Sequence, residues 1–137
     1  MKAITRALIL CAIFYLQINA DEYVVISNKN AQILSAEQIK AIYLKKLIIV
    51  NDINIVPINL DSGDQLRDKF NNEILNMSVS RLQTHWTKQH YLGHRPPLSL
   101  KSQESVKAFV KKVDGAIGYV NKKNIDDEVR VLYQWRD

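Results

Sequence analysis

A change from strand to helix is encoded in the stretch Ile58-Asn59-Leu60-Asp61-Ser62-Gly63-Asp64-Gln65-Leu66-Arg67-Asp68-Lys69-Phe70. The apolar run 55–60 has the composition of a strand, and the Ser62-Gly63 pair after it is typical of a turn. Leu66 and Phe70 then stand four residues apart, as they would on one face of a helix. The start of such a helix carries free backbone N–H groups and the positive end of the helix dipole. The stretch therefore predicts a place where an anion can bind.

Strands and helices alternate on both sides of this stretch. Strands are predicted at residues 23–26, 55–60, 115–120 and 129–133, where β-branched and apolar residues gather. Helices are predicted at residues 36–44 and after each of three turns or caps, at Ser62-Gly63, Ser78 and Ser102. This alternation predicts an α/β fold, with a mainly parallel sheet flanked by helices.

Local signals also fix where helices begin and which side they bury. Ser35 and Gln38 have the spacing of a capping box, so the first helix is expected to start after Ser35. The helix that follows Ser78 is expected to face the core with Val79, Leu82 and Trp86. Gly93 and Pro96-Pro97 are expected to end that helix and to open an extended loop. Pro57 indicates that its strand lies at an edge or that Pro57 stands at the strand's start.

The first twenty residues have the pattern of a secretory signal peptide. Lys2 and Arg6 are followed by an apolar run at residues 7–16, and Ala20 supplies the small residue that a cleavage site requires. A retained N-terminal anchor is the alternative, but the apolar run is short for a membrane span. Cleavage would remove Cys11 and leave residues 21–137 as one domain. We therefore expect a secreted protein of the periplasm.

Composition excludes several classes of function. Loss of Lys2 and Arg6 leaves 17 basic and 14 acidic residues, a net charge of +3 that is spread along the chain. Nucleic-acid binding usually requires basic residues that cluster, so no nucleic-acid partner is expected. The chain beyond residue 20 contains no cysteine, which excludes disulfides and thiol chemistry there.

Catalysis and metal binding have little support in the sequence. Ser62 does not lie in a nucleophile-elbow pattern, and no paired carboxylates or phosphate loop are present. His85, His90 and His94 lie close together, but Gly93 should end the helix before His94 and no acidic ligand is near. We therefore expect no enzymatic activity, no metal and no cofactor.

Four motifs, in order, resemble one known family. Residues 34–44, 56–70, 85–97 and 115–120 are similar to its "L-S-x-x-x-L-x-x-I-F-L" helix, its segment leading into a Ser-Gly-Thr turn, its "Y-W … G-R-P-P" stretch and its "G-A-I-G-Y-V" strand. The chain resembles the phosphate-type periplasmic substrate-binding proteins, and in particular their short, single-lobe members. These motifs span nearly all of residues 21–137. The resemblance implies a periplasmic-binding-protein-like domain of type 2.

The resemblance also implies a ligand, partners and site residues. Phosphate or a related oxyanion would bind the amides and hydroxyl of Ser62, Gly63 and Asp64, with Ser27 and Arg95 as further candidates. Full-length members hold the anion between two lobes, and this chain is long enough for one. A second copy of the chain or another protein would be needed to complete such a site. The expected role is a binding protein that acts with a membrane transporter or sensor.

Two departures from the family pattern support a second interpretation. Asp64 replaces the family's threonine and would repel an anion, and residues 59–61 lack the family's arginine. Arg67 lies one turn into the helix and has two open interpretations. It partly compensates for the missing arginine, or it is a solvated surface charge paired with Asp64 or Asp68, which is the interpretation that we favour. The alternative function is therefore a ligand-free interaction module of a membrane transport or sensing complex.

Overall fold

The computed structural model of the chain describes residues 21–136. The predicted signal peptide, residues 1–20 with Cys11, lies outside the described residues. Within residues 21–136 the chain alternates between strands and helices, which confirms the predicted α/β class.

The main sheet contains five strands within the described residues. They are β1 (Glu22–Ser27), β4 (Val56–Leu60), β5 (Leu98–Leu100), β6 (Ala116–Asn121) and β7 (Arg130–Arg136), in the order β5-β4-β6-β1-β7. β4 is parallel to β5 and β6, whereas β1 is antiparallel to both β6 and β7. Four strands therefore share one direction, and β1 runs the opposite way. This arrangement confirms the mainly parallel sheet. Because β1 and β4 run in opposite directions, their last residues lie at opposite ends of the sheet.

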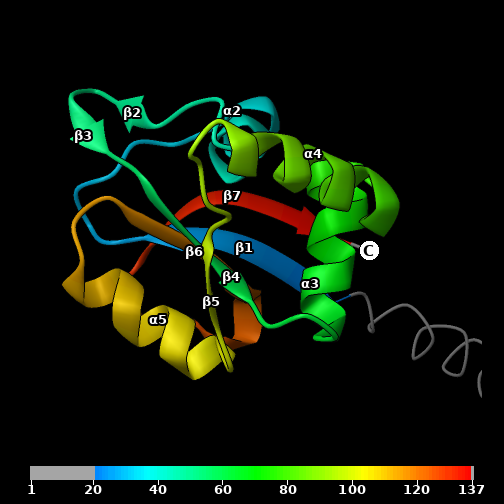
Figure 1. Cartoon of the computed structure of the whole chain (residues 1–137). Coiled ribbons are helices and arrows are strands. Elements are labelled where there is room, and N and C mark those ends of the chain that lie inside the picture. The colour runs from blue at the N-terminus through cyan, green and yellow to red at the C-terminus, as the bar shows by residue number, and fades with distance from the viewer. Residues whose placement is uncertain (1–20, 137) are drawn as a thin grey trace, which may run out of the picture.

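Helices cover both faces of this sheet, as predicted (Figure 1). One face carries α5 (Gln103–Lys112), and the other carries α2 (Ala36–Tyr43) and α3 (Gln65–Phe70), which continues as the π-helical turn η1 (Asn71–Leu75). A 3-10 turn, η2 (Lys122–Asn124), precedes β7. A hairpin of β2 (Ile49–Val50) and β3 (Ile53–Asn54) is joined through Asn51 and Asp52, both with positive φ. Two such residues form the tight turn that this kind of hairpin favours.

The core lies mainly between the sheet and the helices α2 and α3. The predicted capping box is present, because Ser35 Oγ accepts a hydrogen bond from Gln38 N at 3.1 Å and Gln38 Oε1 accepts one from Ser35 N at 2.9 Å. Phe70 is fully buried and stacks on Tyr119 of β6, with ring centroids 4.0 Å apart. Tyr43 meets Phe70 edge-on, with centroids 4.6 Å apart. The helix stripe that the sequence indicates therefore packs into the core as predicted.

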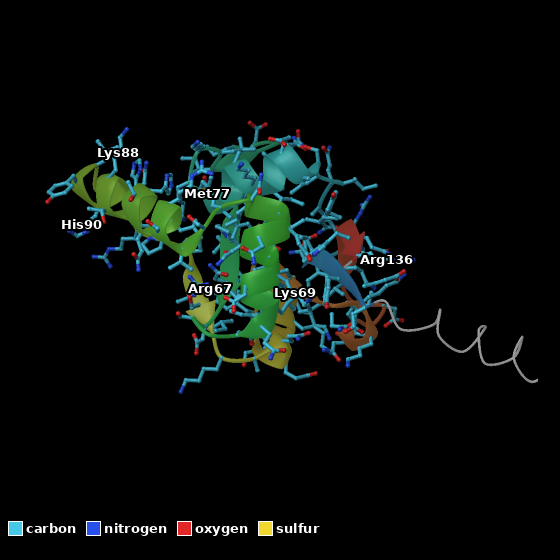
Figure 2. The ribbon with its side chains drawn as sticks, turned by 90° about the vertical axis from the view of Figure 1, so that its right-hand side faces the viewer. Arg67, Lys69, Met77, Lys88, His90 and Arg136 are labelled. Atoms are coloured by element: carbon cyan, nitrogen blue, oxygen red, sulfur yellow. The ribbon has the colours of Figure 1, made fainter. Side chains whose placement is uncertain are left out.

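The segment after η1 differs from the prediction. Ser78 caps α4 (Val79–Tyr91) as predicted, by accepting a hydrogen bond from Arg81 N at 3.2 Å. No residue of α4 is buried, however, and Val79 is 66% exposed. Lys88 and His90 lie on the end of α4 that projects away from the sheet (Figure 2). The apolar spacing identified the helix, but spacing alone cannot say whether another element covers its apolar side.

The predicted extended loop after Pro96-Pro97 also forms a strand. β5 pairs with β4 through Ile58 with Leu98 and Leu60 with Leu100. β4 is therefore an internal strand, and Pro57 lies near its start, beside the point where β5 begins to pair. This position confirms the strand-start interpretation of Pro57, since its missing N–H is needed by no bond to β5.

Candidate oxyanion-binding site

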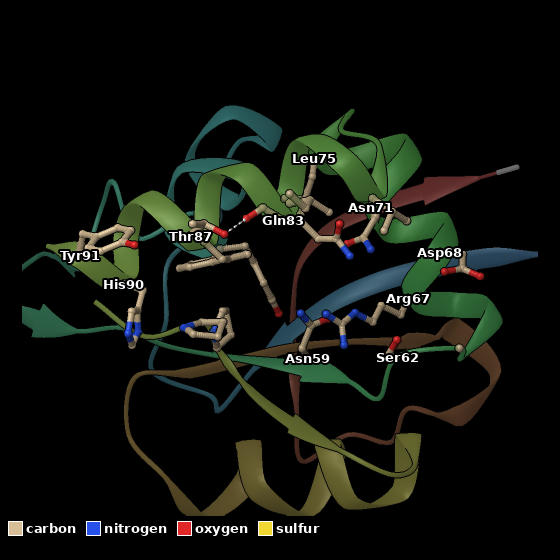
Figure 3. A pocket seen from close by; sticks show the side chains of 17 residues that line it. Asn59, Ser62, Arg67, Asp68, Asn71, Leu75, Gln83, Thr87, His90 and Tyr91 are labelled. Atoms are coloured by element: carbon tan, nitrogen blue, oxygen red, sulfur yellow. Dashed lines mark hydrogen bonds between the residues drawn. The ribbon is translucent and has the colours of Figure 1, made fainter. Parts of the chain in front are cut away.

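A cavity of about 740 Å³ lies at the end of β4, between α3–η1 on one side and α4 on the other. Asn59, Ser62, Gly63 and Arg67 line one end of it. Figure 3 shows Asn59, Ser62 and Arg67 close to one another, with His90 and Tyr91 of α4 at the opposite end. The cavity brings together the predicted Ser62-Gly63 turn and two residues that the sequence prediction did not assign to a site.

Arg67 supplies the positive charge of this cavity. Its Nη1 donates a hydrogen bond to the Leu60 carbonyl at 3.0 Å, which holds the guanidinium over the end of β4. Among residues 21–136 no carboxylate forms an ion pair with Arg67. The interpretation of Arg67 as a solvated charge paired with Asp64 or Asp68 is therefore wrong. Because a guanidinium has five N–H donors, several of them remain available to a ligand.

Asn59 is the second donor, and the core beneath it fixes its orientation. Tyr119 Oη accepts a hydrogen bond from Leu60 N at 3.2 Å and donates one to Asn59 Oδ1. The carboxamide oxygen is therefore occupied, and the amide NH₂ is left to face the cavity. Burial raises the pKa of the Tyr119 hydroxyl, so Tyr119 keeps the proton that it donates to Asn59.

Tyr43 borders the same cavity from α2. Its hydroxyl donates a hydrogen bond to the Ile58 carbonyl at 2.8 Å, and burial raises its pKa well above the ordinary tyrosine value. A hydroxyl that stays protonated is uncharged, so it does not repel an anion. The core side of the cavity therefore carries fixed polar groups without negative charge.

The turn before α3 forms at Ser62-Gly63, as predicted. Asp64 N donates to the Asp61 carbonyl at 3.1 Å, and Gly63 has φ of +90°, as a type II turn requires. This turn delays the helix start, so Asp64 and not Ser62 is the N-cap, with Asp64 Oδ1 accepting from Leu66 N at 2.8 Å. Ser62 is left exposed beside the cavity. The carboxylate of Asp64 is engaged with the helix and borders a different depression on the surface.

This geometry predicts that two neighbouring alanine variants differ in stability. Asp64→Ala is expected to lower the free energy of unfolding by about 1 kcal/mol, because it removes the side chain that caps α3. Ser62→Ala is expected to change it by less than about 0.5 kcal/mol, because an exposed side chain without a structural partner is removed. Urea unfolding followed by circular dichroism measures both, and Asp64→Asn should keep most of the cap. A larger loss in Ser62→Ala than in Asp64→Ala would contradict the assignment of the cap.

The remaining predicted site residues lie elsewhere. Ser27 is the last residue of β1 rather than part of a loop, is 2% exposed, and donates through Oγ to the Asn28 carbonyl at 2.8 Å. Ser27 lines a separate cavity of about 270 Å³. The reason is that β1 runs opposite to β4, so its last residue lies at the other end of the strands. Arg95 is exposed and does not line the larger cavity, although Pro96 and Pro97 beside it do. Neither residue joins Ser62.

The three histidines have separate surroundings. His85 Nε2 lies 2.9 Å from the Leu44 carbonyl, and His94 Nδ1 lies 2.7 Å from Gln89 Oε1. His90 lines the cavity. Within residues 21–136 no group of three or more His, Cys, Asp or Glu side chains is placed to hold a metal ion.

Asn59 and Arg67 carried weak signals in the sequence. An asparagine inside an otherwise apolar strand is a buried polar group that needs a partner, and this alone marks Asn59 as unusual. Arg67 could not be distinguished from a surface charge, because its direction depends on the position of the Leu60 carbonyl. Trp86 lines the cavity from α4. Its spacing in the sequence is that of a core residue, so the sequence predicts that it belongs to the core.

Comparison with known proteins identifies solved structures with a similar fold. No protein-family model matches the chain, and no curated protein matches its sequence. A structure from Clostridium perfringens, assigned as a phosphate ABC transporter substrate-binding protein with bound phosphate, matches with a TM-score of 0.66 and 26% identity, over 82% of this chain and 44% of that one. An ABC-type phosphate transport receptor from Vibrio cholerae matches with a TM-score of 0.65 and 16% identity, over 82% of this chain and 46% of that one. PstS from Borrelia burgdorferi matches with a TM-score of 0.63 and 18% identity, over 82% of this chain and 47% of that one.

The fold is thus that of a periplasmic-binding-protein-like domain. Its likeness is to the phosphate-type substrate-binding proteins, which confirms the resemblance that the sequence motifs indicate. The chain spans 44–47% of the length of these three structures. Within the described residues, no helix has the length and apolar character needed to cross a membrane.

Proposed function

We propose that this protein binds phosphate or a related oxyanion in the cavity at the end of β4, without catalysing a reaction. The observation that carries this proposal is the guanidinium of Arg67, which faces the amide of Asn59 and has no ion-pair partner among residues 21–136. Guanidinium groups form short, strong hydrogen bonds to phosphate oxygens. Ser62 adds a hydroxyl, and the Clostridium perfringens neighbour holds phosphate on a similar fold.

The setting of this proposal is solute capture outside the cytoplasm. Residues 1–20 act as a secretion signal, residues 21–137 form the binding domain, and the domain delivers its ligand to a membrane transporter or sensor. The names of the neighbours, which belong to phosphate transport, support this role. Asp64 no longer opposes it, since the carboxylate is turned to the helix cap and away from the cavity.

Titration calorimetry with inorganic phosphate at low salt tests the proposal. We expect saturable binding, and a weakening of roughly 10- to 100-fold in Arg67→Met, because a charged hydrogen-bond donor contributes about 1.5–3 kcal/mol. Arg81→Met is the matched control, since Arg81 is an exposed arginine of α4 that does not line the cavity. Equal weakening in the two variants would mean that general charge, and not this site, attracts phosphate.

A second candidate function is supported by α4. The helix has no buried residue, and Val79, Tyr91 and Leu92 are between 61% and 85% exposed. An amphipathic helix whose apolar side is fully buried by no other element of the described residues can pack against another protein. This favours an interaction module of a membrane transport or sensing complex. No heat and no thermal shift at millimolar phosphate would make this the better account.

A further inference from the structure

The cavity is much larger than the anion that its polar end can hold. Phosphate has five heavy atoms and fills roughly 150 Å³ at most, if each takes the ~30 Å³ share of a water molecule. The cavity measures about 740 Å³, which is in the range of sites for small organic ligands. An ion bound to Arg67 and Asn59 would leave most of this volume to water.

The volume beyond Arg67 is lined by apolar and aromatic groups. Trp86 and Tyr91 of α4 border it, together with Pro96 and Pro97 from the segment that follows. Trp86 is half-buried and is held against the ring of His85, with centroids 4.8 Å apart. Aromatic and proline surfaces of this kind stack on flat or apolar parts of a ligand. The two ends of the cavity therefore favour different chemical groups.

The segment on the α4 side of the cavity is basic, which favours an anionic ligand over a cationic one, although none of its Lys or Arg side chains lines the cavity. Residues 76–101, which include all of α4, contain four Lys or Arg residues and no Asp or Glu. Asp68 is the acidic residue that borders the cavity, and Figure 3 shows its carboxylate farther from Asn59 than Arg67 is. Gln83 lies along α4 between the two ends and His90 lies at the end far from Arg67, and both offer hydrogen bonds to a ligand's polar substituents.

We infer that the preferred ligand is an organic oxyanion with a ring, such as a phosphomonoester, and not inorganic phosphate alone. Its anionic group binds Arg67, Asn59 and Ser62, and its ring lies against Trp86 and the Pro96-Pro97 segment. This inference rests on the proposed function, because it places the anionic group at the same donors. It adds the class of the ligand and assigns Trp86 as the residue that selects it.

Calorimetric titration with phenyl phosphate and with inorganic phosphate tests this inference. We expect phenyl phosphate to bind at least about fivefold more tightly, since stacking of a planar ring on an aromatic side chain contributes about 1–3 kcal/mol. Trp86→Leu should remove most of this preference and leave phosphate affinity within about twofold. Trp86→Phe keeps a ring and should keep much of the preference. Arg67→Met should weaken both ligands.

The outcomes separate this inference from the function on which it rests. Equal affinities for the two ligands, or a preference that survives Trp86→Leu, would overturn the inference and leave phosphate binding standing. Binding of neither ligand would overturn both. Phenyl phosphate binding that Arg67→Met does not weaken, or equally tight binding of phenol, would show that the ring binds without an anion site and would overturn the inference. Circular dichroism of each variant establishes that it is folded.

Discussion

Gly115→Ala is expected to lower the free energy of unfolding by about 3 kcal/mol or more. Gly115 has φ of +80°, a conformation that costs other residues about 1–2 kcal/mol. A Cβ at this position would stand 2.1 Å from the carbonyl oxygen of Asn54, which belongs to the backbone and cannot rotate away. The Gly115 carbonyl also accepts a hydrogen bond from Val56 N at 2.8 Å, at the start of the β4–β6 pairing. Relief of the clash must therefore disturb that pairing, and overpacking typically adds another 1–3 kcal/mol.

Gly93→Ala is the matched control for this prediction. Gly93 has nearly the same φ, +81°, but a Cβ there would have no heavy atom within 4 Å. Its replacement should therefore cost only the torsional part, about 1 kcal/mol. Urea unfolding of the two variants measures the difference. Equal losses would mean that the contact with the Asn54 carbonyl does not lower the free energy of unfolding. Both glycines would then be required only for their positive φ.

The sequence predicted best those features that depend on neighbours in the chain. The capping box of Ser35 and Gln38 and the cap of α4 at Ser78 each require only a few consecutive residues. The stripe of Leu66 and Phe70 was also recognised correctly as core. In these cases the local pattern and the tertiary structure favour the same arrangement.

Features that depend on distant segments were missed. β5 exists because Leu98 pairs with Ile58, forty residues away, and neither residue carries a signal for this contact. Ser62 and Asp64 are both good N-cap residues, so local preference could not choose between them. The type II turn at Gly63 moves the helix start to Asp64, which makes Asp64 the N-cap. Ser27 was misplaced because the direction of β1 follows from sheet topology and not from its own composition.

Only the part of the candidate site that depends on neighbouring residues in the chain was predicted from the sequence. Ser62 and Gly63 belong to a local turn, and the structure places both beside the cavity. The donors Arg67 and Asn59 are aimed by the Leu60 carbonyl and by Tyr119, which lies about sixty positions further along the chain than Asn59. A side chain's direction in the folded protein follows from such partners, which spacing in the sequence does not reveal.

Phe70→Ala is expected to have the largest effect of the single substitutions considered, a loss of about 4 kcal/mol in the free energy of unfolding. Phe70 is fully buried, lies parallel to Tyr119 within 7°, and meets Tyr43 edge-on. Removal of a buried phenylalanine side chain costs about 3–5 kcal/mol, because it leaves a cavity and loses these ring contacts. For a domain of this size the midpoint of thermal unfolding should fall by roughly 12–20 °C.

Phe109→Ala is the matched control, since Phe109 of α5 is only half-buried and packs on the opposite face of the sheet. Its loss should be no more than about half that of Phe70→Ala, because less apolar surface is uncovered. Phe70→Leu then separates stability from binding. It keeps most of the buried volume, and Tyr119 is still held through its hydrogen bonds to Leu60 and Asn59, so phosphate affinity should stay within about threefold. A folded Phe70→Leu protein that no longer binds phosphate would mean that ring stacking, and not the hydrogen bonds of Tyr119, orients Asn59.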